Sequence, residues 1–282
     1  MTDEEVVFIR QFIDENRGDS RWRLSRKLCQ TWGWVQPNGA LRDMVCRGLM
    51  LHLERAGAIQ LPPIRVRMVN PLVHRQTPSQ IAIDQTLLEG KLSDLGPLEF
   101  RQVRRTEAEA LFNSLIQEYH YLGYCQPVGE QLKYMVLAQG RPIACLAWSS
   151  APRHIGDRDR FIGWTKPVRE KNLSLIACNT RFLLLPWVRV SCLASHLLGK
   201  MVKILPVDWA RIYNHPLHYL ETFVDRERFP GTCYRAANWL YIGRTTGRGK
   251  KDQTGKANRS RKDILGYPLS KNFRDHLCGG RA

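Results

Sequence analysis

Hydrophobic positions with a helical period dominate the first part of the chain. Apolar residues recur every three or four positions over residues 6–13, 21–33 and 41–56. This spacing predicts three short amphipathic helices. A Pro-Pro pair follows them, and we place this helical module at residues 1–64. Residues 65–97 mix polar and apolar positions without a clear period, and we expect a linker there.

From residue 98 onward, alternating runs typical of strands are interleaved with helical runs. Residues 180–186 are almost continuously apolar, which is typical of a central strand covered on both faces. The order of elements predicts a mixed α/β domain over residues 98–243. The expected strands cover residues 98–104, 131–139, 142–149, 180–186, 219–225 and 241–243, and the expected helices cover residues 106–121, 191–205 and 234–240.

Charge narrows the class of partner. The chain has 43 Lys and Arg against 26 Asp and Glu, a net charge of +17. A globular protein this basic favours a nucleic acid as its ligand, and we favour DNA. The alternative is a basic surface without a specific ligand. Residues 241–282 alone hold eleven Lys and Arg against three Asp, so we interpret residues 244–282 as a basic C-terminal arm that contacts phosphates, with a solvated tail as the alternative.

The helical module carries exposed cations, yet residues 1–60 hold nine Lys and Arg against eight Asp and Glu, a balance of +1. Three short helices with cations outside suit a helix-turn-helix-like DNA reader, and a helical cap on the main domain is the alternative. The candidate nucleic-acid-binding residues of the module are Arg21, Arg23, Arg26, Lys27, Arg42 and Arg47. Those of the arm are Arg244, Arg248, Lys250, Lys251, Lys256, Arg259, Arg261 and Lys262.

Cysteine usage and hydropathy indicate the compartment. The eight cysteines are scattered without a CxxC pair or a paired Cys/His spacing, which argues against a zinc ribbon or finger. Most stand inside apolar runs, as reduced buried thiols do. The N-terminus lacks the features of a signal peptide, and no apolar run reaches a membrane-spanning length. We therefore expect a soluble, cytoplasmic protein with no membrane partner.

Two carboxylates stand on one face of the strand expected over residues 219–225. Glu221 and Asp225 are four residues apart, so about 13 Å separates them at ~3.3 Å per residue. A metal-dependent phosphoryl site would need a third ligand, and His120 and Asp208 are the candidates. The alternative is that Glu221 pairs with a buried arginine such as Arg181.

His120 lies between two tyrosines at the end of the helix expected over residues 106–121. This placement suits a general acid or base, because a helix C-terminus stabilises a charged imidazole. A structural member of an aromatic cluster is the alternative. We count His120 among the candidate catalytic residues.

Part of the chain resembles the GNAT acetyltransferases. The string LLPWV leads into a helix with LASHLLGKM, and this resembles the place where those enzymes hold the pyrophosphate of acyl-CoA. CYRAANWLYIGRT is similar to their final Tyr-containing helix and the strand after it. The resemblance implies a GNAT-like α/β domain and gives Tyr234 the position of a general acid, with a packed aromatic as the alternative. Residues 189–194 contain no glycine where the phosphate loop of that family usually has one.

Longer strings resemble the DruA family of the Druantia anti-phage system and its relatives near transposable elements. These strings are EYHYLG, DRFIGW, NTRFLLLPWV, ETFVD, GTCYRAANWLYIGRTTGRG and KDILGYPL. The resemblance implies a role in defence against phage or in mobile DNA, together with other components of a defence system.

Three classes of function follow from these observations. The first is a nucleic-acid-binding component of a defence system or a mobile genetic element. The second is an acyl or aminoacyl transferase with a GNAT-like domain. The third is a metal-dependent nuclease or transposase-like strand-transfer enzyme built on Glu221 and Asp225.

Overall fold

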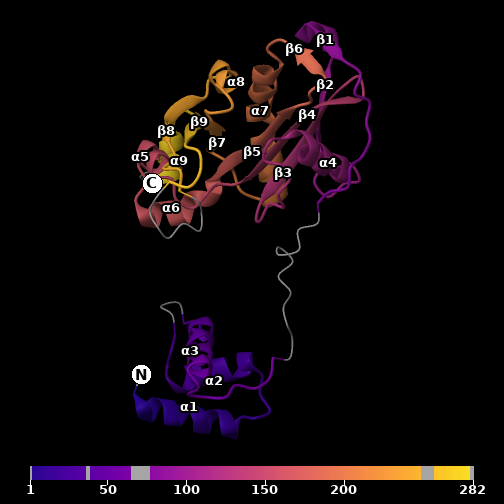
Figure 1. Ribbon diagram of the computed structural model, residues 1–282. Coiled ribbons are helices and arrows are strands. Elements are labelled where there is room, and N and C mark those ends of the chain that lie inside the picture. Colours follow the sequence, from indigo (N-terminus) through magenta and orange to yellow (C-terminus); the bar gives the residue numbers. More distant parts are fainter. Residues whose placement is uncertain (1, 36–38, 65–76, 249–256, 280–282) are drawn as a thin grey trace. The chain divides into compact units, whose positions relative to one another are not determined.

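Figure 1 shows the computed structural model of the chain, which describes residues 2–35, 39–64, 77–248 and 257–279. The chain divides into two compact units, residues 1–74 and residues 75–282. Each unit has its own hydrophobic core, so each is described by itself. No helix in the described part of the chain combines the length and the apolar character that a membrane crossing needs.

The N-terminal unit contains the three expected helices. They are α1 (Asp3–Glu15), α2 (Arg21–Thr31) and α3 (Asp43–Arg55). Thr2 and Glu5 form a capping box at the start of α1, which satisfies two backbone N–H groups that a helix start leaves unpaired. The apolar stripes of the helices meet in a small core of Ile9, Ile13, Leu24, Leu28, Cys29, Cys46, Met50, Ile59 and Leu61.

The C-terminal unit is built on a seven-stranded mixed sheet with the order β2-β3-β4-β5-β7-β9-β8. Neighbouring strands are antiparallel except for the parallel pair β5 and β7. The mixed α/β class is therefore confirmed. The strands are β2 (Leu98–Gln102), β3 (Gln131–Ala138), β4 (Arg141–Ser150), β5 (Ile176–Leu184), β7 (Tyr219–Asp225), β8 (Leu240–Arg244) and β9 (Lys262–Pro268), and β1 (Leu88–Gly90) pairs separately with β6 (Val188–Val190).

The two longest helices of the C-terminal unit, α4 (Glu109–Tyr119) and α7 (Leu193–Tyr213), cover opposite faces of the sheet. Lys133 of β3 reaches Glu109 of α4, whereas the next residue, Tyr134, donates its hydroxyl to Asp208 of α7 at 2.8 Å. Successive side chains of a strand point to opposite faces, so these contacts assign the faces. The shorter helices are α5 (Gly156–Ile162), α6 (Lys166–Asn172), α8 (Thr232–Ala236), α9 (Phe273–Cys278), and the 3-10 turns η1 (Leu92–Leu95) and η2 (Leu173–Leu175).

The parallel pair in the centre of the sheet opens toward its carboxyl end. Register between β5 and β7 runs from Ile176 opposite Tyr219 to Asn179 opposite Thr222, and it stops there. Beyond Asn179, β5 continues to Leu184 against β4 alone, while β7 continues to Asp225 against β9 alone. Side chains of the second halves of β5 and β7 therefore flank a divergence of the two strands, and several candidate residues lie around it.

The last part of the chain differs from the predicted basic arm. Residues 262–268 form β9, which lies between β7 and β8, with Ile264 and Leu265 buried. Residues 245–261 therefore connect two paired strands, and both ends of this basic segment are anchored in the sheet (Figure 1). We call it the β8–β9 connection. The expected linker also changes, since its described residues include β1 and η1.

Candidate nucleic-acid interface

Three arginines converge on one buried carboxylate beside the β8–β9 connection. Asp263 on β9 is 3% exposed. Its Oδ1 accepts from Nε of Arg244 at 2.9 Å, and its Oδ2 lies 3.6 Å from Nη1 of Arg226 and 3.8 Å from Nη2 of Arg235. The three arginine side chains are 39%, 49% and 60% exposed, in the order Arg226, Arg235 and Arg244. Three positive charges on one carboxylate leave a local excess of two, held at the surface.

Arg244 also lines a hollow of about 440 Å³ at the base of the β8–β9 connection. The backbone here is held by hydrogen bonds, from Thr245 N to the carbonyl of Lys262 at 2.9 Å and from Arg259 N to the carbonyl of Gly247 at 2.9 Å. Guanidinium groups held by an ordered backbone suit the oxygens of a phosphate. The residues lining the hollow are Arg244, Thr245, Thr246, Arg248, Ala257 and Arg261.

We use the name arginine surface for Arg226, Arg235, Arg244, Arg248 and Arg261. The last three are among the cations predicted from the sequence, whereas Arg226 and Arg235 are not. Both precede β8 in the chain, and their approach to Asp263 depends on β9 inserting between β7 and β8. The sequence signal that could have indicated them is their position in the family strings: Arg226 directly follows ETFVD, and Arg235 lies within CYRAANW. Lys250, Lys251 and Lys256 lie outside the described residues.

The cations predicted in the helical module have different surroundings. Arg21 is held by Glu54 through two hydrogen bonds of 3.0 and 3.1 Å, so its guanidinium is used inside the module. Arg26 lies over the ring of Trp22 at 5.0 Å, and that ring is 50% exposed. Lys27 pairs with Asp19, and Arg47 pairs with Asp43. Nε of Arg42 donates to the carbonyl of Val35, and Arg23 is exposed on α2.

Glu221 is part of a buried ion network. Both Glu221 and Arg158 are 0% exposed, and Nη1 of Arg158 lies 3.2 Å from Oε1 of Glu221. Arg158 also pairs with Asp159 at 2.8 Å, and Asp159 pairs with Arg169 at 3.0 Å. The partner of Glu221 is thus Arg158, not Arg181. Burial raises the pKa of Glu221 to about 7 although Arg158 opposes the shift.

His120 is a neutral imidazole at neutral pH. Its Nδ1 accepts a hydrogen bond from the backbone N–H of Leu122 at 3.2 Å, so the ring proton is on Nε2. Burial, together with the nearby charges of Arg181 and Lys262, lowers the pKa of His120 to about 4. In this tautomer the lone pair of Nδ1 is used by the N–H of Leu122, so the ring can offer the N–H of Nε2 as a hydrogen-bond donor.

Asp225 lies at the end of β7 on the same face as Glu221, because the two are separated by an even number of residues. It is 5% exposed and stands opposite Lys262 in the register of β7 and β9. Its Oδ2 accepts from the hydroxyl of Ser260 at 2.8 Å. Ser260 belongs to the β8–β9 connection. Its hydrogen bond to Asp225 therefore holds that connection next to the place where β5 and β7 separate.

Tyr234 and Asp208 lie on the opposite side of the sheet. The hydroxyl of Tyr234 donates to Oδ1 of Asn179 at 2.6 Å, and burial raises the pKa of this phenol. Asp208 on α7 accepts from Tyr134 at 2.8 Å and from Arg211 at 2.7 Å. The structure therefore brings His120 and Asp225 together with Lys262 and places Tyr234 and Asp208 elsewhere.

Among the described residues, no three His, Cys, Asp or Glu side chains form a group that could hold a metal ion. Glu221 is committed to Arg158, and Asp208 is on the far face of the sheet from Asp225. The predicted third ligand of a metal site is thus not supplied by Asp208.

These features define a basic mixed α/β protein with an arginine-rich surface at one end of its sheet. The chain belongs to the DruA family, since the family described as "Druantia protein DruA" matches residues 53–258. Membership implies a component of an anti-phage defence system. No curated protein matches the chain.

Solved acetyltransferase structures are similar to this chain in fold alone. The ribosomal-protein-S18-alanine N-acetyltransferase from Escherichia coli is 12% identical, with 62% of this chain and 95% of that chain covered and a TM-score of 0.36. The spermidine/spermine N-acetyltransferase SpeG from Vibrio cholerae is 12% identical, with 64% and 99% covered and a TM-score of 0.39. A GNAT family acetyltransferase from Streptococcus pneumoniae is 12% identical, with 62% and 100% covered and a TM-score of 0.40. Similarity at this level carries no inference about activity.

Proposed function

We propose that this DruA family member is a DNA-binding component of a defence system and that the arginine surface contacts the phosphate backbone. The observation that carries the proposal is the convergence of three arginines on the single carboxylate of Asp263, beside a hollow that Arg248 and Arg261 also line. One carboxylate cannot neutralise these charges. A polyanion with regularly spaced oxygens would do so and would release its counterions on binding.

The chemistry of the surface favours backbone contacts over base readout. Guanidinium groups bind two phosphate oxygens at once, and such contacts position a nucleic acid without reading its sequence. The side chains come from the turn after β7, from α8, from β8 and from the β8–β9 connection. Because separate elements hold them, the surface has a defined geometry. We propose a second contact at the helix-turn-helix-like module, where exposed Trp22 and Arg26 lie together on α2.

Of the predicted catalytic residues, we retain His120, with Asp225 and Lys262 near it. We propose that this group acts on a nucleic-acid strand bound at the arginine surface. The neutral imidazole of His120 carries the proton on Nε2, which can donate a hydrogen bond to a phosphate oxygen of the strand, and Ser260 links Asp225 to the connection that carries the arginine surface. Glu221 and Tyr234 are proposed as supports of the two faces of this site, since their polar groups are bonded to Arg158 and Asn179.

The test is a salt series with two charge-matched double variants. Arg248→Gln with Arg261→Gln removes two cations of the arginine surface that have no ion pair among the described residues. Lys200→Gln with Lys203→Gln removes two exposed cations from α7. The affinity for a 30-base-pair DNA duplex and for a single strand of the same length is measured at several salt concentrations.

We expect the arginine variant to reduce the slope of log affinity against log salt by about 2 for the duplex, at about 0.9 per lost phosphate contact. The lysine variant should keep the slope of the unaltered protein. An equal loss in both variants, or an affinity that does not depend on salt, contradicts the proposal.

A further inference from the structure

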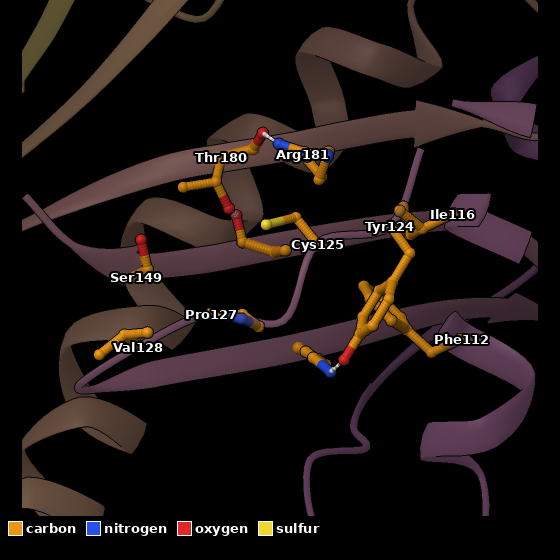
Figure 2. A pocket seen from close by; sticks show the side chains of 11 residues that line it. Phe112, Ile116, Tyr124, Cys125, Pro127, Val128, Ser149, Thr180 and Arg181 are labelled. Carbon is orange, nitrogen blue, oxygen red and sulfur yellow. Dashed lines mark hydrogen bonds between the residues drawn. The ribbon is translucent and has the colours of Figure 1, made fainter. Parts of the chain in front are cut away.

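A second hollow lies on the α4 face of the sheet, and none of its lining residues belongs to the arginine surface. It has a volume of about 180 Å³ and is bounded by α4, by strands β3, β4 and β5, and by the segment after α4. Figure 2 shows Thr180 and Arg181 on one side of this space and Phe112 and Tyr124 on another. We call it the α4 hollow, and its lining is Phe112, Ile116, Tyr124, Cys125, Pro127, Val128, Lys133, Ala147, Ser149, Thr180 and Arg181.

Arg181 brings to the α4 hollow a positive charge that no carboxylate in the described part of the chain pairs with. Its Nε donates to the carbonyl of Gly123 at 3.0 Å and its Nη1 to the carbonyl of Thr180 at 2.8 Å. Within the described residues, Nη2 makes no hydrogen bond and no ion pair reaches this guanidinium. Burial lowers the pKa of Arg181, which shows that its charge is held against the preference of its surroundings.

Lys133, the other cation of the α4 hollow, is already satisfied. Its side chain is 2% exposed, and its ammonium donates to Glu109 at 2.8 Å and to Asn113 at 2.8 Å. Because Glu109 neutralises Lys133, the open charge of the hollow belongs to Arg181. Phe112, Ile116 and Val128 are among the apolar residues of its lining.

We propose that the α4 hollow is a binding site for a small organic anion, with a carboxylate or phosphate head on Arg181 and an apolar body against Phe112, Ile116 and Val128. The volume is several times that of one water molecule, about 30 Å³ in the liquid, so the space suits a small organic molecule better than a single ion. The free Nη2 supplies the donor that orients the head. Apolar walls with few converging polar groups are typical of ligand sites.

This inference is separate from the proposed contacts of the arginine surface, because Arg181 is not part of that surface, although its charge acts on His120. Cys125 lines the α4 hollow and its side chain is exposed, so alkylation of this thiol reports on the site. Cys192, exposed before α7 and outside the lining, is the internal control. Cys145, which is 0% exposed, stays unmodified as long as the chain is folded.

The experiment compares anionic iodoacetate with neutral iodoacetamide on the full chain, using mass spectrometry to follow each cysteine. For each reagent we take the alkylation rate at Cys125 divided by the rate at Cys192. This ratio should be about fivefold higher for iodoacetate than for iodoacetamide, because one unit charge about 4 Å away has an effect of this size in water. This preference should disappear in Arg181→Gln and remain in Arg211→Gln, whose arginine is exposed on α7. An equal ratio for the two reagents in the unaltered protein overturns the proposal.

Protection by competitors tests the ligand class. Phenyl phosphate and benzoate represent the two head groups, benzyl alcohol lacks the charge, and inorganic phosphate lacks the apolar body. We expect one or both aromatic anions to slow the alkylation of Cys125 at least threefold without an effect on Cys192, and the more protective one identifies the head group. Equal protection by benzyl alcohol or by inorganic phosphate, or no protection at all, contradicts the inference. If Arg181→Gln exposes Cys145 and is thus unfolded, this competition in the unaltered protein decides.

Discussion

At the scale of single residues, the buried pair of Glu221 and Arg158 tests whether a carboxylate on β7 supports the fold. Glu221→Gln keeps the size of the side chain but leaves the charge of Arg158 with Asp159 as its remaining partner. Removing one member of a buried pair costs about 3–5 kcal/mol when the other charge is left unpaired. Because Asp159 still pairs with Arg158 and burial raises the pKa of Glu221, we expect a smaller loss of about 1–3 kcal/mol in the free energy of unfolding, measured by chemical denaturation.

The matched control for this substitution is Glu227→Gln, because Glu227 is exposed just after β7. Its effect should stay within about 0.5 kcal/mol. If Glu221→Gln keeps full stability and abolishes an activity on nucleic acid, then Glu221 belongs to the reactive site and the structural role is wrong.

His120 carries a prediction on pH. Its pKa is about 4 in the folded chain and 6.5 for the free side chain, so the folded state binds fewer protons between these values. The stabilising contribution of the neutral imidazole is therefore present above pH 6.5 and is lost as the pH falls through 4. Allowing for partial solvent exposure, the loss between pH 7 and pH 5 should be about 1–2 kcal/mol.

His120→Asn retains an acceptor for the N–H of Leu122 and removes the titrating group. Denaturation curves at pH 7 and pH 5 should therefore show a smaller acid loss in this variant than in the unaltered chain. His52→Asn, at an exposed position on α3, should leave the acid loss unchanged. A His120 variant with the same acid loss as the unaltered protein argues against the buried neutral imidazole.

At the scale of elements, the placement of β9 depends on a close approach at Gly266. A Cβ atom at this position would lie 1.6 Å from the hydroxyl oxygen of Tyr219, which is buried on β7. Gly266→Ala must displace Tyr219 or β9, and overpacking of this kind costs about 1–3 kcal/mol. Because β9 carries Asp263, we also expect weaker nucleic-acid binding by this variant.

Gly199→Ala is the control for that substitution, because no atom of the described residues lies within 4 Å of the added Cβ and the residue is inside α7. Alanine in place of glycine in a helix should raise stability by about 0.5–1 kcal/mol. Thermal unfolding of both variants, together with their affinity for duplex DNA, measures the two effects. Unchanged stability and binding in Gly266→Ala would show that β9 tolerates the extra methyl group.

Elements with a strong local pattern were predicted from the sequence. The hairpin of β3 and β4 is an example, although its turn residues are Gln139 and Gly140, one position earlier than expected, and both have a positive φ. The positive φ values fit the turn type that matches strand twist. The helix predicted to end before Pro206 continues through it to Tyr213, with Leu205 and Trp209 buried on either side of the proline. Packing against the sheet outweighs the local cost of proline here.

At the scale of the whole molecule, charge and local periodicity can be read from the chain itself. The excess of cations, the helices of the N-terminal unit, most strands of the sheet and the family strings all depend on composition or on residues close together in the sequence. Such features can be predicted from the sequence, because alternation and helical spacing reflect which side of one element is buried.

The tertiary structure alone decided which distant residues meet. Insertion of β9 between β7 and β8 turned the predicted arm into a connection anchored at both ends and gathered Arg226, Arg235 and Arg244 on Asp263. The same holds for Arg158 as the partner of Glu221, 63 residues away in the sequence. Strand order and long-range ion pairs follow from burying the whole sheet at once, and no local pattern contains that information.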